Sequence, residues 1–290
     1  MKSEFTKQWI IENSVDIVSE YDRGVLTLRG LHYRLVSLGM TNDVGHYKKV
    51  VNSLISARWD GIIDFEAFSD HDRAMIGETK SEYTELGDEI EKAKESIQAW
   101  MNYYFRNRWE NQPYYPEVFI EKKALQGVFQ PVCLDLGVGL GACKGYPSLT
   151  FLNDAAKRFQ IAEENGKMPI ILYFGDYDPS GEDIPRSIGE NLSKFGIDVE
   201  VRRISLLEDQ VVEWKLPPAP TKISDTRTAQ WDGLGQVELD AVAPSKLQRL
   251  CREAIENIFD EDLHDELIAE EKIEREKYKT ELKNYVIGIK

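Results

Sequence analysis

The sequence predicts an α/β domain, a parallel sheet flanked by helices, with an α-rich domain before it and a helical extension after it. From residue 117 onward, apolar runs of strand length alternate with amphipathic stretches of helix length, which is typical of a parallel sheet covered by helices. Residues 1–60 instead carry apolar residues at helical spacing. A chain of 290 residues has room for about two domains of ordinary size.

The first 75 residues read as a compact helical domain. Residues 1–20 predict an amphipathic helix, and Thr27 has the side chain expected at the N-cap of a second helix that ends at Leu38. A third helix is predicted over residues 45–57, followed by a short strand or wing at 62–65. Helix, helix and short β element is the order of a winged-helix DNA-binding module.

The rest of the chain divides into a connector, the α/β domain and the extension. Four strands are predicted in the α/β domain, at residues 118–120, 140–143, 168–174 and 199–204. Helices are predicted between them, at residues 123–136, 148–164 and 181–194. The predicted domain limits are therefore 1–75, 76–115 (helical and rich in aromatic residues), 116–207 and 208–290.

Three acidic residues follow directly after two of the predicted strands. Glu121 comes after the first strand, and Asp176 and Asp178 come after the third. Parallel strands end at one edge of their sheet, so these carboxylates are expected to converge there. Hard oxygen ligands without a nearby histidine favour Mg²⁺ over zinc. The alternative is that the two aspartates cap a turn and that Glu121 pairs with Lys122 or another base.

These residues belong to a longer pattern that resembles a known family. Glu121-Lys122, the turn Lys144-Gly145-Tyr146-Pro147 and the run from Gly175 to Ile184 (GDYDPSGEDI) are similar to a TOPRIM domain, most of all that of the A subunit of DNA topoisomerase VI and the meiotic double-strand-break protein. The likeness covers about 90 residues. It implies a Mg²⁺ site at Glu121, Asp176 and Asp178, with Asp183 as the last acid of the motif.

The same family carries a nucleophilic tyrosine on a winged helix before the TOPRIM domain. The matching stretch here retains Arg29 and Tyr33, with Gly30 and His32 where the family has an acid and a first tyrosine. At about 100° per residue, Tyr33 lies opposite the leucine stripe of its helix. Tyr33 is therefore predicted to point away from the core of its own domain.

The resemblance implies an Mg²⁺-dependent enzyme that cleaves double-stranded DNA. Tyr33 would attack a phosphodiester, Arg29 would steady the phosphate, and Glu121 would act with the metal. The family implies a homodimer that cuts both strands, a separate ATPase (B-type) subunit, and a cytoplasmic, nucleoid-associated location. Two rival functions remain open, a TOPRIM nuclease that uses activated water and a DNA-binding subunit with a degenerate site.

The overall charge is unusual for a DNA-binding protein. The chain has 36 Lys and Arg against 51 Asp and Glu, a net charge of −15, whereas phosphate binding favours basic proteins. Residues 24–59, however, hold five bases and one acid. The predicted DNA-binding residues are these five bases and one from the later turn: Arg29, Arg34, Lys48, Lys49, Arg58 and Lys144. No apolar run is long enough to cross a membrane, so no membrane partner is expected.

Overall fold

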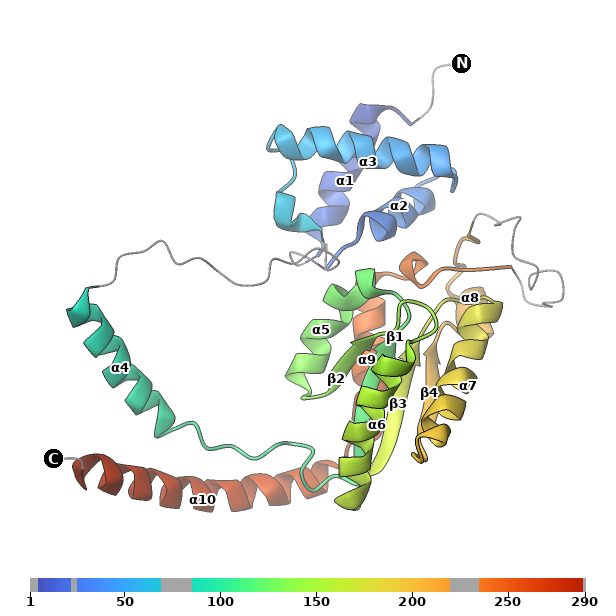
Figure 1. Ribbon diagram of the computed structural model, residues 1–290. Helices are drawn as coiled ribbons and strands as arrows, with labels where there is room; N and C mark the ends of the chain where they lie inside the picture. The colour runs from blue at the N-terminus through green and yellow to red at the C-terminus, as the bar shows by residue number, and fades with distance from the viewer. Residues whose placement is uncertain (1–4, 22–24, 69–84, 220–234, 289–290) are drawn as a thin grey trace. The chain divides into compact units, whose positions relative to one another are not determined.

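The computed structural model describes residues 5–21, 25–68, 85–219 and 235–288, and these form two compact units (Figure 1). The first unit combines Met1–Arg73 with Tyr114–Ile258, and the second combines Ala74–Pro113 with Phe259–Lys290. Two of the predicted domain limits fall within two residues of these divisions. The predicted C-terminal extension is not one piece, because its two parts belong to different units.

Three helices form the first part of the first unit: α1 (Lys7–Ser19), α2 (Leu28–Ser37) and α3 (Val44–Trp59). Their apolar faces meet in a closed core whose fully buried members include Ile10, Leu31, Leu35, Val50 and Leu54. The Thr27 side chain accepts a hydrogen bond from the Gly30 N–H at 2.9 Å. It is the N-cap of α2, as the sequence predicts.

The predicted strand or wing at residues 62–65 is wrong. Gly61 adopts a positive φ of 69° after the end of α3 and turns the chain. The Asp64 carboxylate then accepts from the Glu66 N–H at 3.0 Å and begins a short 3-10 helix, η1 (Phe65–Ala67). This cap holds the backbone in a helical turn, and the only β pairing described in this part is the single bridge between Leu26 and Phe68.

The second part of the first unit is the predicted parallel sheet. Its strands are β1 (Tyr114–Ile120), β2 (Gly139–Ala142), β3 (Met168–Phe174) and β4 (Glu200–Ser205). They lie in the order β2-β1-β3-β4, and every pair is parallel. Ile120 is paired with both Ala142 and Phe174, so three strands end together at one edge.

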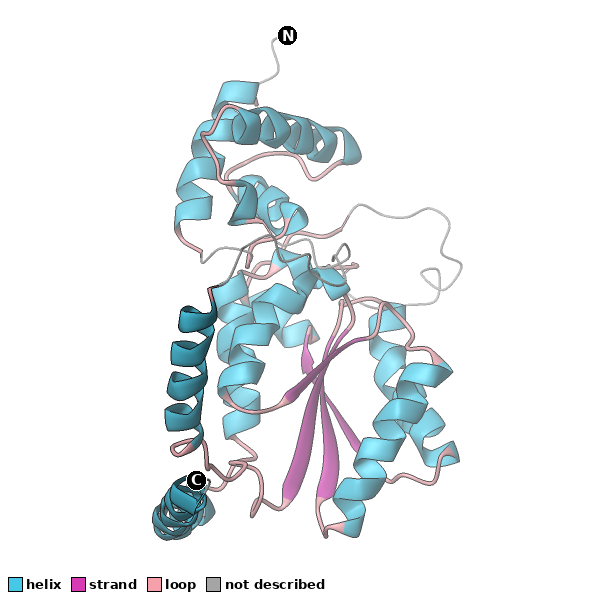
Figure 2. Cartoon of the chain, turned by 60° about the vertical axis from the view of Figure 1, so that its left-hand side comes forward, coloured by secondary structure: helices cyan, strands magenta, loops and turns pink. Residues whose placement is uncertain are grey.

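Helices cover both faces of this sheet (Figure 2). The helices are α5 (Gln126–Asp135), α6 (Leu149–Glu164), α7 (Pro179–Lys194), the short α8 (Glu208–Glu213) and α9 (Pro244–Glu256). Alternate strand residues point to opposite faces: Tyr173 packs in the core formed with α6 and α7, whereas the ring of its neighbour Phe174 lies 4.8 Å from that of Phe129 on α5. The continuous apolar strands of the sequence reflect this burial on two sides.

The second unit contains α4 (Leu86–Trp100) and α10 (Glu261–Gly288). The Trp109 and Phe259 rings lie 5.0 Å apart in it, edge to face, and the Gln112 amide donates to Asp260 O at 2.8 Å. The helical stretch predicted for the connector ends at Trp100, and its first residues lie outside the described part of the chain. None of the helices described is both long and apolar enough to span a bilayer.

Thr27 offers a test of how α2 is held. Besides capping α2, its hydroxyl donates to Asp240 Oδ1 at 3.1 Å. We expect Thr27→Ala to lower the free energy of unfolding by about 2 kcal/mol, because a cap and a buried hydrogen bond are lost together. Thr6→Ala, which removes the exposed cap of α1, should cost only about 1 kcal/mol. Equal losses in urea unfolding would mean that the bond to Asp240 contributes nothing.

Candidate functional site at the carboxyl edge of the sheet

The candidate site begins where the neighbouring strands β1 and β3 end. The Glu121 N–H donates to Phe174 O at 2.8 Å, which continues the ladder by one residue. The Asp176 N–H then donates to Glu121 Oε2 at 2.9 Å. The fold thus brings together two acidic residues that lie 55 positions apart in the chain.

Asp176 is buried, and both of its carboxylate oxygens are bonded. Oδ1 accepts from the Leu239 N–H at 2.7 Å, and Oδ2 lies 3.0 Å from Lys122 Nζ. Burial raises the pKa of Asp176 to about 7, and the Lys122 ammonium opposes this effect. Burial also raises the pKa of Glu121 above its usual range.

Lys122 Nζ lies among three carboxylates. Besides Asp176, it contacts Glu238 Oε2 at 3.2 Å and Asp240 Oδ2 at 3.0 Å. Burial disfavours the charged ammonium, but the three acids outweigh it and raise the pKa of Lys122. We call Lys122, Asp176, Glu238 and Asp240 the Lys122 cluster. It joins the end of β1 to the end of β3 and to the segment that leads into η4 (Leu239–Ala241).

The other acids predicted as metal ligands have different structural roles. Asp178 Oδ1 accepts from the Gly181 N–H at 2.7 Å and caps α7. Asp183 is half-buried on α7, where Oδ2 accepts from the Tyr146 hydroxyl at 2.7 Å and Oδ1 pairs with Arg186. The capping role of Asp178 is the alternative that the sequence had left open.

These carboxylates do not fit a Mg²⁺ ion as they are arranged. Within the described residues, no three His, Cys, Asp or Glu side chains are placed to hold a metal. Both oxygens of Asp176 are bonded within the chain, and the positive charge beside it comes from Lys122. The predicted convergence of acids is therefore present for Glu121 and Asp176, but a lysine neutralises Asp176.

Helix α2 packs its polar face against the segment around η4. Arg29 binds Glu238 through two hydrogen bonds, from Nε at 3.0 Å and from Nη2 at 2.6 Å. Arg34 donates to the backbone oxygen of Ala241. Lys122 and Arg29 together lower the pKa of Glu238, although burial alone would raise it. Glu238 thus connects α2 directly to the Lys122 cluster.

Tyr33 lies on this same face of α2 and is fully buried. It is not a member of the α1–α3 core, so its predicted direction on the helix is correct. The Tyr33 side chain is nevertheless buried, because the face that a helical wheel leaves outside one domain is covered by another segment. The Arg29 guanidinium carbon lies 5.7 Å from the centre of the Tyr33 ring. The Tyr33 hydroxyl has no hydrogen-bond partner among the described residues.

The predicted DNA-binding bases fall into two groups. Arg29 and Arg34 are bonded within the chain, so the expectation that they face DNA is not supported by this arrangement. The other four lie elsewhere. On or beside α3, Lys48 is exposed, Lys49 donates to Phe5 O, and Arg58 lies 5.8 Å from the Phe65 ring centre. Lys144 is exposed in the turn after β2 and has a positive φ of 57°.

The sequence did not identify Lys122, Glu238 and Asp240 as site residues. The position of Lys122, directly after an acid at a strand end, could have indicated a role in the site. For Glu238 and Asp240 the only indication in the sequence is that two acids stand two residues apart. Nothing in the local pattern shows that a segment about 60 residues beyond Asp176 returns to the same edge of the sheet.

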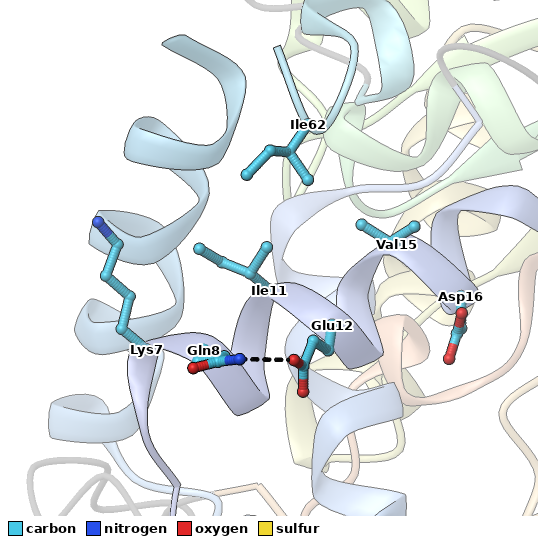
Figure 3. A pocket seen from close by; sticks show the side chains of 7 residues that line it. All are labelled: Lys7, Gln8, Ile11, Glu12, Val15, Asp16 and Ile62. Carbon is cyan, nitrogen blue, oxygen red and sulfur yellow. Dashed lines mark hydrogen bonds between the residues drawn. The ribbon is translucent and has the colours of Figure 1, made fainter. Parts of the chain in front are cut away.

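A groove also runs along the outer side of α1 (Figure 3). Its lining consists of Lys7, Gln8, Ile11, Glu12, Val15, Asp16 and Ile62. Gln8 donates to Glu12 across one helical turn at 2.9 Å. With two carboxylates and one ammonium, this groove does not favour a phosphate-bearing ligand.

Comparison with known proteins adds no relative: no family model, curated protein or solved structure matches the chain.

The Lys122 cluster predicts a specific response to Mg²⁺. Lys122→Met leaves Asp176 and Asp240 without a paired cation, while Glu238 keeps Arg29, and should lower the free energy of unfolding by about 3 kcal/mol. Millimolar Mg²⁺ should raise the melting temperature of this variant and leave that of the wild type unchanged, because only the variant exposes the oxygens to an ion. Lys157→Met, which breaks an exposed pair with Asp154, should change stability little. Equal stabilisation of wild type and Lys122→Met by Mg²⁺ would contradict this prediction.

Tyr33 predicts a pH dependence at alkaline pH. Burial, reinforced by Glu238, raises the pKa of the Tyr33 phenol to about 12 from 10.0. Between these values the unfolded chain loses the phenol proton and the folded chain keeps it, so stability falls as the pH rises through this window. The fall should be shallower in Tyr33→Phe, and an ultraviolet titration of wild type minus variant should show a phenol ionising near pH 12. A difference component near pH 10 would show instead that Tyr33 is solvated.

Proposed function

We propose that this protein cleaves double-stranded DNA by tyrosine transesterification, in the manner of a topoisomerase VI A subunit, with Tyr33 as nucleophile. The observation that carries the proposal is the Tyr33 hydroxyl, which is buried beside the cation of Arg29 and forms no hydrogen bond of good geometry among the described residues. An unpaired buried hydroxyl costs free energy. Packing alone would therefore favour phenylalanine at this position, and the hydroxyl is better explained by chemistry.

The proposed step exchanges one phosphate ester for another. The Tyr33 oxygen forms a bond to phosphorus while the bond from phosphorus to the 3′ oxygen breaks. The phenol loses its proton and the 3′ oxygen gains one, so no oxidant or other co-reactant is needed. Arg29 and Lys122 are the cations closest to this chemistry, and Arg29 can bind a phosphate with the same two donors that now bind Glu238.

The arrangement described is a closed one, because the segment around η4 covers Tyr33. We propose that DNA phosphate competes with Glu238 for Arg29 and releases α2 from this segment. Release would solvate the phenol and remove the burial that raises its pKa. The family resemblance adds a homodimer, a separate ATPase subunit, Mg²⁺ dependence and a cytoplasmic, nucleoid-associated location to the proposal.

A second candidate function is DNA binding without cleavage. It is favoured by the ion pair between Lys122 and Asp176, which leaves no preformed metal site among the described residues. The helical module of α1, α2 and α3 would then act alone. A nuclease that uses water instead of Tyr33 is the third outcome of the same experiment.

The test is adduct formation on plasmid DNA. Wild type should form a covalent protein–DNA adduct, and Tyr33→Phe should form none while keeping, or gaining by about 1 kcal/mol, its free energy of unfolding. Tyr47→Phe is the matched control, since its ring also lies near Arg29, at 5.3 Å, and it should retain the adduct. Running each assay with Mg²⁺ and with EDTA tests the metal dependence.

Three results would contradict the proposal in different ways. Cleavage that survives Tyr33→Phe without an adduct would identify a water nuclease. DNA binding without cleavage by the wild type, with or without an ATPase partner, would favour the binding module. Loss of the adduct in both Tyr33→Phe and Tyr47→Phe would show that the reaction depends on the contacts around Arg29, and would not identify Tyr33 as the nucleophile.

A further inference from the structure

Helix α3 has a charge opposite to that of the whole protein. Its sixteen residues include three bases, Lys48, Lys49 and Arg58, and no acid, while the chain as a whole has a net charge of −15. A basic helix on an acidic protein favours a polyanionic partner at that helix.

The outward face of α3 is a single straight stripe. At about 100° per residue, Lys48, Asn52, Ile55 and Trp59 fall within an arc of roughly 60°, and all four are exposed. The buried residues Val50, Leu54 and Ala57 lie on the opposite side. We call these four residues the α3 stripe. Lys48 and Asn52 form no hydrogen bond or ion pair within the described residues, so both are available to a partner.

The α3 stripe also contains apolar surface that lacks a cover. Ile55 is 45% exposed and Trp59 is 77% exposed. The Trp59 ring stands 5.2 Å from that of Phe65, edge to face. Contiguous exposed apolar residues with a charged residue beside them are typical of interaction sites.

We infer that the α3 stripe reads A·T base pairs in the major groove, an inference that rests on the proposed action on DNA. A helix fits the major groove of B-form DNA, where an asparagine amide binds adenine through two hydrogen bonds and an aliphatic side chain contacts the thymine methyl group. Asn52 and Ile55 are neighbours on the stripe and supply these two contacts. Lys48, one turn before Asn52, supplies a phosphate contact.

A second copy of the chain is the main rival occupant of this face. A two-fold contact through the α3 stripe would bring the two copies of Lys48 together with no acid on either helix to offset them. The groove along α1 differs in this respect, since it has two carboxylates and one ammonium (Figure 3). Nucleic acid is therefore a better partner for α3 than a second copy of the chain is. It also fits α3 better than it fits the groove along α1.

The inference is tested by binding, separately from cleavage. In EDTA, the full chain is titrated by fluorescence anisotropy with an A·T-rich duplex, a G·C-rich duplex of equal length, and the A·T-rich duplex with uracil in place of thymine. We expect roughly tenfold tighter binding to A·T than to G·C, and a few-fold loss when the thymine methyl groups are removed.

Three residues of the α3 stripe have separate expected effects on DNA binding. Asn52→Ala should abolish the A·T preference, and Ile55→Ala should abolish the difference between thymine and uracil. Lys48→Ala should weaken binding to all three duplexes and reduce the salt slope by about one. Gln8→Ala and Val15→Ala make the same kinds of change on the outward face of α1 and should alter none of these affinities.

Several results would overturn the inference. Equal affinity for A·T and G·C duplexes, or for thymine and uracil, excludes base reading by this face. Dissociation of a dimer by Ile55→Ala or Trp59→Ala in light scattering, with DNA affinity unchanged, identifies a contact between copies. An adduct-forming protein with no A·T preference would refute this inference alone, and a preference without any adduct would refute only the proposed cleavage.

Discussion

The ammonium of Lys122 is the interaction on which the arrangement of the first unit depends. One cation holds three carboxylates at 3.0 to 3.2 Å, and these come from the end of β3 and from the segment that enters η4. Without that charge, the acids would repel each other in a buried place, where a carboxylate is costly unless it is paired. From Glu238 and Asp240 the same network continues to Arg29 and Thr27, so α2 is held by the cluster as well as by its own core.

This network decides which surfaces remain for a partner. Helix α2 uses its polar face, with Arg29, Arg34 and Tyr33, inside the chain. Helix α3 uses its apolar side in the α1–α3 core and leaves Lys48 and its exposed aromatic end outward. A DNA duplex would thus meet α3 first, and the chemistry attributed to α2 would follow only after the contacts of Glu238 had been exchanged for phosphate.

Where burial alone determines an element, the sequence was sufficient to predict it. β3 spans the apolar run of residues 168–174 without a change, and Thr27 caps α2 because a hydroxyl before a helix satisfies a free N–H. The strand or wing predicted at residues 62–65 does not form. The Asp64 carboxylate caps a short 3-10 helix there, although the two preceding isoleucines favour a strand. The burial of Tyr33 and the role of Asp240 depend on contacts across more than 200 residues, and no local pattern encodes them.

The position of Lys122 also explains how one edge of the sheet can gather acids. A strand-end carboxylate needs a nearby positive charge, and the fold supplies it from the residue directly after Glu121. A lysine ammonium holds carboxylates less firmly than a divalent cation does, because it carries one charge on a flexible side chain. The Lys122 cluster therefore stabilises the closed arrangement and would lose Glu238 if an anion bound Arg29. An arrangement held by Lys122 and Arg29 through the shared carboxylate of Glu238 would therefore loosen if a phosphate replaced that carboxylate on Arg29.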